Sequence, residues 1–372
     1  MGAAHLLEHL VFKGTRRRTA KQLAEELEIR GGSLDAYTSR DQTSFQAHVL
    51  DADVPLAVEI LTDLVRHPLL RPEDLELERN VVLEEINGVR DTPDDLVFEL
   101  HARELWPEHP YGYSILGTPE TVGALKADDL ARMHKSGYYP GNCVFAAAGQ
   151  VEHSQLLTVL EREGWFEGAA VPPRQPVEAV PARRGSARSE RRDSQQTHIV
   201  LGTDTIHGRD PRRYGLAILA NLLGGGMSSR LFQRVREELG LAYAVYSFHH
   251  LFQSTGLLGV YVGTQHRTAG DAEGVIQEEL ARISGHGLTE QELAVGRQQL
   301  KGQIMLALES PGSRMQRLAS TVLLYDRYRR LEEILAEIDS VSRDAIGAIA
   351  AEFFTPARWS VVRLGPDRGT EG

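Results

Sequence analysis

The chain has 372 residues, of which 41% are apolar and 25% charged, and its formal net charge is −11. Its length allows two domains of ordinary size, and its composition is typical of a globular protein with a large core. The acidic balance disfavours nucleic acid as a general partner, and no run of about 18 apolar residues predicts a membrane span. The single Cys143 excludes an internal disulfide framework. With no signal peptide visible, we expect a cytoplasmic protein, while periplasmic and organellar locations stay open.

The first expected helix carries two histidines one turn apart, in the segment 2–13 (GAAHLLEHLVFK). At about 100° per residue, His5 and His9 share one face and Glu8 lies on the same hemisphere, while the leucines can be buried. Two imidazoles at this spacing can bind one metal ion, and the carboxylate beside them can hold a water molecule. This is the H-x-x-E-H inverzincin motif. The alternative is two helical histidines without a metal.

Helices and strands of the first half follow from periodicity and turn signals. The basic segment 13–18 is expected to be a solvated connection. Thr19 is expected to cap a helix that ends at two glycines, and strand-forming residues favour extended structure in 33–50. Further helices are expected at about 55–66, 72–88, 94–105, 127–136 and 152–162, with a short apolar strand at 143–149.

A change of composition separates the two halves. Residues 166–195 contain four prolines followed by several arginines, which indicates a solvated interdomain linker, with a nucleic-acid patch as the alternative. Beyond the linker we expect strands at about 198–203, 242–250, 255–264 and 359–364, and helices at about 211–223, 228–239, 269–284 and 289–308.

The second half resembles the first, with a period of a little over about 210 residues. Residues 70–85 align with 288–303, and residues 2–5 align with 215–218. In this register the three motif residues fall on Ile218, Asn221 and Leu222, so the metal chemistry is expected only in the first half. Strands mixed with helical pairs predict an α+β fold. Its two homologous domains, 1–165 and 196–372, would each be a mostly antiparallel sheet with helices on one face.

A catalytic zinc site needs a third protein ligand and an open position. The helix that begins at Pro72 carries several glutamates, of which Glu78 and Glu85 are two turns apart and share a face. Both could also be ordinary surface carboxylates.

Three segments carry a resemblance to a known family. HLLEHLVFKGT, SLDAYTSRDQTSF and ERNVVLEEINGVRDTPDD resemble the insulinase–pitrilysin zinc peptidases, and most of all the branch that contains the mitochondrial processing peptidase. The resemblance extends over nearly the whole chain, including HPYGYSILGTPETV and NLLGGGMSSRLFQRVREELGLAYAV. In that family the third zinc ligand corresponds to Glu85, 76 residues after His9, and Glu78 matches a carboxylate that supports the site.

The resemblance implies a zinc-dependent endopeptidase that hydrolyses extended peptides. His5, His9 and Glu85 would hold Zn²⁺, and Glu8 would act as general base on water. Arg236 and Tyr243 match a family pair that contacts the substrate near the metal; alternatively they are a surface charge and a strand-edge core residue. The strand that pairs with the substrate backbone would contain Asp35, Ala36, Tyr37, Thr38 and Ser39. Asp35 stands where the family usually has Asn, so substrate binding there is expected to differ.

The resemblance also implies a clamshell of two domains that enclose the site, with a peptide as partner and a homodimer or a heterodimer with a related subunit as possible assemblies. The acidic balance favours basic peptides. Because the family has strands ahead of the motif helix, we expect this chain to be shortened at its start. The family also contains non-catalytic partner subunits, and a peptide-binding member that does not cleave is a third interpretation.

Overall fold

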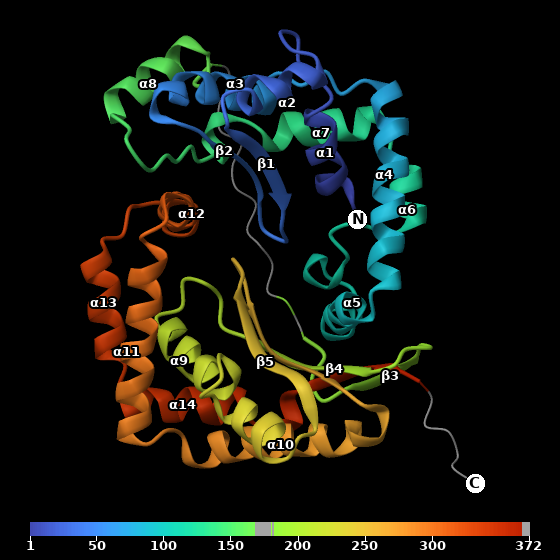
Figure 1. Ribbon diagram of the computed structural model, residues 1–372, viewed down its shortest axis with the longest axis vertical. Coiled ribbons are helices and arrows are strands. Elements are labelled where there is room, and N and C mark those ends of the chain that lie inside the picture. Colours follow the sequence, from blue (N-terminus) through green and yellow to red (C-terminus); the bar gives the residue numbers. More distant parts are fainter. Residues whose placement is uncertain (168–179, 181, 367–372) are drawn as a thin grey trace. The chain divides into compact units, whose positions relative to one another are not determined.

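The computed structural model describes residues 1–167, 180 and 182–366 (Figure 1). The chain divides into two compact units. Unit 1 contains Met1–Gly88, Ser114–Pro176 and Leu308–Asp326, and unit 2 contains Val89–Tyr113, Val177–Ala307 and Arg327–Gly372. These spatial units are not the sequential domains 1–165 and 196–372, which remain a prediction about the sequence repeat.

Unit 1 is mainly helical. Its helices are α1 (Ala3–Val11), α2 (Ala20–Glu28), α3 (Val54–Arg66), α4 (Pro72–Asp91, whose last residues belong to unit 2), α6 (Pro119–Ala124), α7 (Ala127–Gly137), α8 (His153–Arg162) and α12 (Pro311–Tyr325), with short 3₁₀ turns at Asp51–Asp53 and Pro140–Asn142. Among its described residues the sheet is one antiparallel hairpin, β1 (Ser33–Thr38) and β2 (Thr43–His48). The buried leucines of α1 pack with apolar side chains of α2, α3 and α4 in the core of this unit.

The strand expected at 143–149 does not form. Cys143 and Phe145 pack against the core of unit 1, as the apolar pattern indicates. The backbone of Cys143 is extended, but the segment has no neighbouring strand among the described residues, and a strand needs such a partner for its hydrogen bonds. The prediction from side-chain pattern alone was therefore wrong for the backbone.

The basic segment 13–18 is not a solvated connection throughout. Arg18 is buried, and its guanidinium donates hydrogen bonds to three carboxylates of α2 and α3. These acceptors are Glu26, Glu59 and Asp63. A buried charge needs such partners, so Arg18 ties the segment to the two helices.

Unit 2 is built on a five-stranded sheet of order β3-β7-β4-β6-β5, in which only the β3–β7 pair is parallel. The strands are β3 (Ala187–Arg191), β4 (Thr197–Thr205), β5 (Ala242–Leu251), β6 (Gly256–Thr264) and β7 (Ser360–Gly365). The helices are α5 (Pro93–Leu105), α9 (Arg213–Gly224), the π-helix η4 (Phe232–Glu238), α10 (Ala269–His286), α11 (Glu290–Ala307), α13 (Leu331–Ser340) and α14 (Arg343–Phe353), with 3₁₀ turns at Pro110–Gly112, His266–Thr268 and Pro356–Arg358. β3 lies inside the predicted linker 166–195, and residues 168–179 and 181 of that linker lie outside the described residues.

Both faces of this sheet are covered, because every residue of β4 and β6 is buried. Helices of the second half, among them α9, α10 and α14, contribute to the core on one face. The other face is covered by α5, which comes from the first half of the sequence and packs Val97 and Leu100 against β4 and β7. Helices were predicted on only one face of the sheet. The structure has helices on that face and, in addition, α5 on the opposite face.

The helix α12 makes the converse exchange, because it comes from the second half and belongs to unit 1. There, Gln316 donates a hydrogen bond of 2.6 Å to the hydroxyl of Tyr37 on β1. Pro93 and Pro311, which open α5 and α12, have the same sequence separation as Leu70 and Leu288 in the aligned repeat. The two exchanged helices are therefore equivalent elements of the two repeats.

Candidate metal centre

The position of α1 is determined by its apolar face and by its first residue. Leu6, Leu7 and Leu10 are buried, which turns the opposite, polar face of the helix away from the core. Gly2 precedes the helix with φ of 80°, and a Cβ at this position would lie 2.7 Å from the carbonyl oxygen of Leu116. Only glycine suits this combination of backbone angle and close approach.

Three predicted ligands come together between α1 and α4. The ligand atoms of His5, His9 and Glu85 all lie within 4.8 Å of one another. His5 Nε2 is 3.5 Å from Glu85 Oε2, and His9 Nε2 is 3.6 Å from Glu85 Oε1. Ligands of a tetrahedral zinc ion, bound at about 2.0–2.2 Å, are separated by roughly 3.4 Å. The nitrogen–oxygen distances fit the edges of such a site, and the donor set of two imidazoles and one carboxylate suits zinc.

Glu78 binds His9 through Nδ1, the ring nitrogen that does not face Glu85. His9 Nδ1 donates to Glu78 Oε2 at 3.0 Å, and Lys13 Nζ lies 2.5 Å from Glu78 Oε1. A proton on Nδ1 leaves the lone pair of His9 on Nε2, the atom that faces Glu85. This carboxylate–histidine arrangement is the usual support of a metal-binding imidazole.

His5 is prepared for a metal in a different way. Burial, and next the neighbouring His9, lower the pKa of His5 to about 4, so its ring is neutral at neutral pH. A metal ligand must be the neutral imidazole. His5 Nδ1 is buried and has no hydrogen-bond partner among the residues that the structure describes.

Glu8 lies on the same helix and is buried. Burial raises its pKa, although a hydrogen bond from Thr38 and the proximity of His9 act in the opposite direction. Thr38 Oγ1 donates to Glu8 Oε2 at 2.5 Å. A carboxylate whose pKa is shifted toward neutrality is suited to accept and return a proton.

The predicted substrate strand is β1 together with the first residue of the following turn. Asp35 is exposed and pairs with Gln46 of β2, whereas Thr38 is directed to Glu8. Within the described part of unit 1, β1 has β2 as its strand partner. Binding of a peptide at this strand remains a prediction, as does the role of Asp35, Ala36, Tyr37 and Ser39.

Arg236 and Tyr243 belong to unit 2, whereas the candidate ligands belong to unit 1. The guanidinium of Arg236 lies 4.7 Å from the ring centroids of both Phe232 and Tyr243. Tyr243 is 77% exposed, so it is not a core residue. π-Helices such as η4, which carries Arg236, are frequent at functional sites. Contact of Arg236 and Tyr243 with a substrate stays a prediction.

Sequence reasoning missed the contact of Lys13 with Glu78 and the hydrogen bond from Thr38 to Glu8. Lys13 was grouped with a solvated turn, but it lies four residues after His9, and helical spacing extended to this residue would have placed it beside Glu78. No local pattern links Thr38 to Glu8, because the two residues lie on different elements 30 residues apart.

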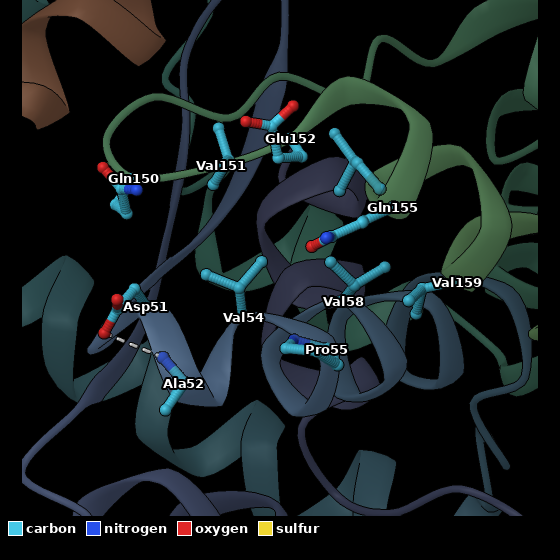
Figure 2. A pocket seen from close by; sticks show the side chains of 11 residues that line it. Asp51, Ala52, Val54, Pro55, Val58, Gln150, Val151, Glu152, Gln155 and Val159 are labelled. Atoms are coloured by element: carbon cyan, nitrogen blue, oxygen red, sulfur yellow. Dashed lines mark hydrogen bonds between the residues drawn. The ribbon is translucent and has the colours of Figure 1, made fainter.

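A separate cavity of about 110 Å³ lies between the first turns of α3 and α8 in unit 1 (Figure 2). Its lining shares no residue with the metal cluster and contains no histidine or cysteine. The lining residues are Asp51, Ala52, Val54, Pro55, Val58, Gln150, Val151, Glu152, Gln155, Leu156 and Val159. Asp51 Oδ1 already accepts a hydrogen bond from the backbone of Ala52. This cavity therefore lacks the imidazoles that accompany the carboxylate in the candidate metal centre.

Two family models match the chain. Residues 1–119 match the insulinase family, peptidase family M16, and residues 124–300 match the peptidase M16 inactive domain. An uncharacterized zinc protease of Streptomyces coelicolor is 38% identical over 357 residues, which are 94% of this chain and 78% of the relative. The uncharacterized zinc protease YmxG of Bacillus subtilis is 36% identical over 95% of this chain and 86% of its own length. The chain belongs to the insulinase family of peptidases, M16.

Solved structures agree with this membership at the level of the fold. A protease from Helicobacter pylori has a TM-score of 0.88 at 20% identity, over 98% of this chain and 89% of that one. A peptidase M16 inactive domain from Pseudomonas fluorescens has a TM-score of 0.89 at 19% identity, over 100% of this chain and 90% of that one. The predicted family and the α+β fold of two units are confirmed. In the described residues no helix is long and apolar enough to cross a membrane.

Proposed function

We propose that this chain is a zinc-dependent endopeptidase that hydrolyses extended peptides. The observation that carries the proposal is the cluster of His5, His9 and Glu85, with its nitrogen–oxygen distances of 3.5 and 3.6 Å. The names of the relatives, zinc proteases, support it at a coarser level. Zinc, when bound by these three residues, would lower the pKa of a water molecule toward about 7 and polarise a substrate carbonyl.

The remaining chemistry belongs to the side chains. Glu8 accepts the proton of the attacking water and returns it to the leaving amine, so one carboxylate acts first as base and then as acid. Glu78 keeps the proton of His9 on Nδ1. The peptide adds as a strand to β1, and Arg236 and Tyr243 of unit 2 stabilise its backbone or the developing oxyanion.

Several finer predictions belong to the same proposal. They are membership in the branch of the mitochondrial processing peptidase, a preference for basic peptides, a cytoplasmic location, and assembly as a homodimer or with a related subunit. Both the metal ligands and the Arg236–Tyr243 pair lie in one chain, so the chemistry does not require a partner.

A non-catalytic subunit is the second candidate, favoured by the inactive-domain model that matches residues 124–300. That match falls mainly on the repeat in which Ile218 and Leu222 replace the two histidines. A cluster of possible ligands is present in the first repeat, which the insulinase-family model matches. The endopeptidase is therefore the function that the site supports best.

The test joins metal content with peptide cleavage. The purified chain is expected to hold one zinc ion and to cleave an unstructured peptide in a chelator-sensitive manner. Glu8→Gln is expected to keep the zinc and to lose at least roughly 100-fold in kcat, because the base is removed and the ligands are not. A wild-type chain that binds zinc without cleaving would favour the non-catalytic subunit, and a Glu8→Gln variant with unchanged turnover would refute the base.

A further inference from the structure

The hydroxyl groups at the turn end of the β1–β2 hairpin form a chain that reaches Glu8. Thr38 is the last residue of β1 and pairs across the hairpin with Thr43, the first residue of β2. Their Oγ1 atoms are 3.2 Å apart, and Thr38 Oγ1 is 2.5 Å from Glu8 Oε2. One carboxylate oxygen of Glu8 is thus held by a side chain from a different element.

The direction of these hydrogen bonds follows from the number of protons. A hydroxyl carries one proton, and an ionised carboxylate can only accept. The Thr38 proton is therefore used toward Glu8, so Thr43 must donate to Thr38. The chain runs from Thr43 through Thr38 to Glu8 Oε2, which leaves Oε1 as the oxygen that is free to receive a proton.

The hairpin holds this chain rigidly. The four-residue turn is closed by a backbone hydrogen bond of 2.8 Å from Ser39 N to Gln42 O. The Ser39 hydroxyl also donates to Gln42 O at 3.0 Å and accepts from Gln42 N at 3.3 Å. On the other face of the strand, Gln316 and Gln42 donate to the Tyr37 hydroxyl. These hydrogen bonds hold the two residues on either side of Thr38 in the chain.

We infer that Thr38 is a positioning residue: it binds one oxygen of Glu8 and presents the other to the water that attacks the peptide. This inference rests on the proposed endopeptidase function. It changes the expected role of Thr38, which the family resemblance assigns to the substrate strand. Because the Thr38 hydroxyl donates its one proton to Glu8, this hydroxyl has none left for a peptide, and only the backbone N–H of Thr38 remains a donor.

The experiment compares Thr38→Val with Thr38→Ser in the full-length, zinc-loaded chain. Valine keeps the shape and the strand preference of threonine but lacks the hydroxyl, whereas serine keeps the hydroxyl. Thr38→Val is expected to lower kcat roughly tenfold or more with little change in KM, and Thr38→Ser to restore most of it. Thr158→Val is the matched control, because Thr158 is an exposed threonine that bonds only within α8.

Two further measurements separate positioning from folding. Zinc stoichiometry and melting temperature of Thr38→Val are expected to match those of Thr158→Val. In a double-mutant cycle, Thr38→Val is expected to add no loss to Glu8→Gln, because Thr38 acts through the carboxylate that is already changed. Thr43→Val is expected to lower kcat less than Thr38→Val, since it acts one bond further away.

Distinct results would overturn the inference. An unchanged kcat in Thr38→Val, a serine variant as slow as the valine variant, or a further loss in the Glu8→Gln background would each do so. A raised KM at unchanged kcat would return Thr38 to substrate binding. If the wild-type chain cleaves nothing, the proposed function fails and the positioning role fails with it. If the wild type cleaves and Thr38→Val equals it, only the positioning role fails.

Discussion

The helices α1 and α9 occupy equivalent places in the two repeats but use the same face in opposite ways. On α1 this face carries His5, Glu8 and His9, and the two imidazoles lie against carboxylates of α4. On α9 the aligned positions of the histidines are Ile218, which is fully buried, and Leu222, which packs against the core. One repeat joins its helices by polar groups and the other by apolar packing.

The helices that pack against α1 and α9, which are α4 and α11, differ in a way that matches the difference between α1 and α9. Leu75 of α4 and Leu293 of α11 are aligned and both are buried, so the two helices share a core position. Glu78 aligns with Gly296, where a Cβ would lie 2.7 Å from Ile218 Cγ2. The absence of a side chain at 296 lets Ile218 approach α11 directly. A polar face with candidate metal ligands and a close-packed apolar face are thus two alternative solutions for one pair of helices.

The largest expected effect comes from copying the second repeat into the first. His5→Ile combined with His9→Leu is expected to reduce zinc stoichiometry from one to nearly zero, because only one of the three ligands remains. The two replacements are the residues that α9 carries at the aligned positions, Ile218 and Leu222. We therefore expect α1 to stay helical and the far-ultraviolet circular dichroism to be retained. Zinc is measured by atomic absorption on dialysed protein.

The matched control for this exchange is Asn221→Glu combined with Leu222→His in α9, which should create no zinc site because Ile218 still stands at the position of the first histidine and Gly296 offers no carboxylate. Bound zinc in the α1 double variant would mean that the ligands lie elsewhere.

Local spacing explains which parts of the site could be predicted. His5, Glu8 and His9 share one helical face, and Glu78 and Glu85 share another, so periodicity alone shows each set of side chains together. Periodicity does not show that the face of α1 meets the face of α4, because these helices are far apart in the sequence. That pairing was predicted from the family resemblance, in which the third ligand lies 76 residues after the second histidine. The hydrogen bond from Thr38 to Glu8 could not be predicted, because it depends on where the hairpin packs against α1.

The exchange of α5 and α12 lies beyond local patterns for the same reason. The helix α5 was expected at about 94–105 and begins one residue earlier, at Pro93, whereas no range was predicted for α12. An amphipathic helix shows that it needs a partner surface, but not which sheet supplies it. The segment 143–149 has a similar lesson for strands. Its apolar pattern predicts a strand, but a strand forms only where another strand lies beside it.

The second prediction concerns the exchanged helices. α5 carries His101 where α12 carries Ala319 at the aligned position. His101 is 1% exposed, and its Nε2 lies 3.3 Å from the carbonyl oxygen of Ser360 on β7. Burial lowers the pKa of His101 from 6.5 to about 4, although hydrogen bonds to the backbone act against this. The folded chain therefore keeps this ring neutral where the unfolded chain would protonate it.

The sign of the pH effect follows from the lowered pKa. Above pH 6.5 the ring is neutral in both states, and between pH 6.5 and 4 only the unfolded state binds the proton. Stability is therefore lost as pH falls through this window and levels off below it. At 1.36 kcal/mol per pKa unit the loss is roughly 3 kcal/mol.

His101→Gln removes this titration and keeps a donor for Ser360. The difference in unfolding free energy between pH 7 and pH 4 should be smaller in the variant by roughly 3 kcal/mol, measured by urea denaturation. An equal pH dependence in both proteins would show that His101 stays protonated or solvated in the folded chain.

The smallest effect tests why α9 and α11 pack so closely. Gly296→Ala places a Cβ 2.7 Å from Ile218 Cγ2, so the core must shift, and we expect a destabilisation of about 1–3 kcal/mol. Gly302→Ala on the same helix meets nothing within 4 Å and should stabilise the chain by about 0.5–1 kcal/mol. Opposite signs in one helix cannot come from helix propensity, which favours alanine at both positions.

In an Ile218→Ala background the Gly296→Ala change should lose its cost, because the opposing methyl group is gone. A Gly296→Ala cost that survives there would mean that α9 is not what requires glycine, and the contrast between the apolar pair α9–α11 and the polar pair α1–α4 would need another cause.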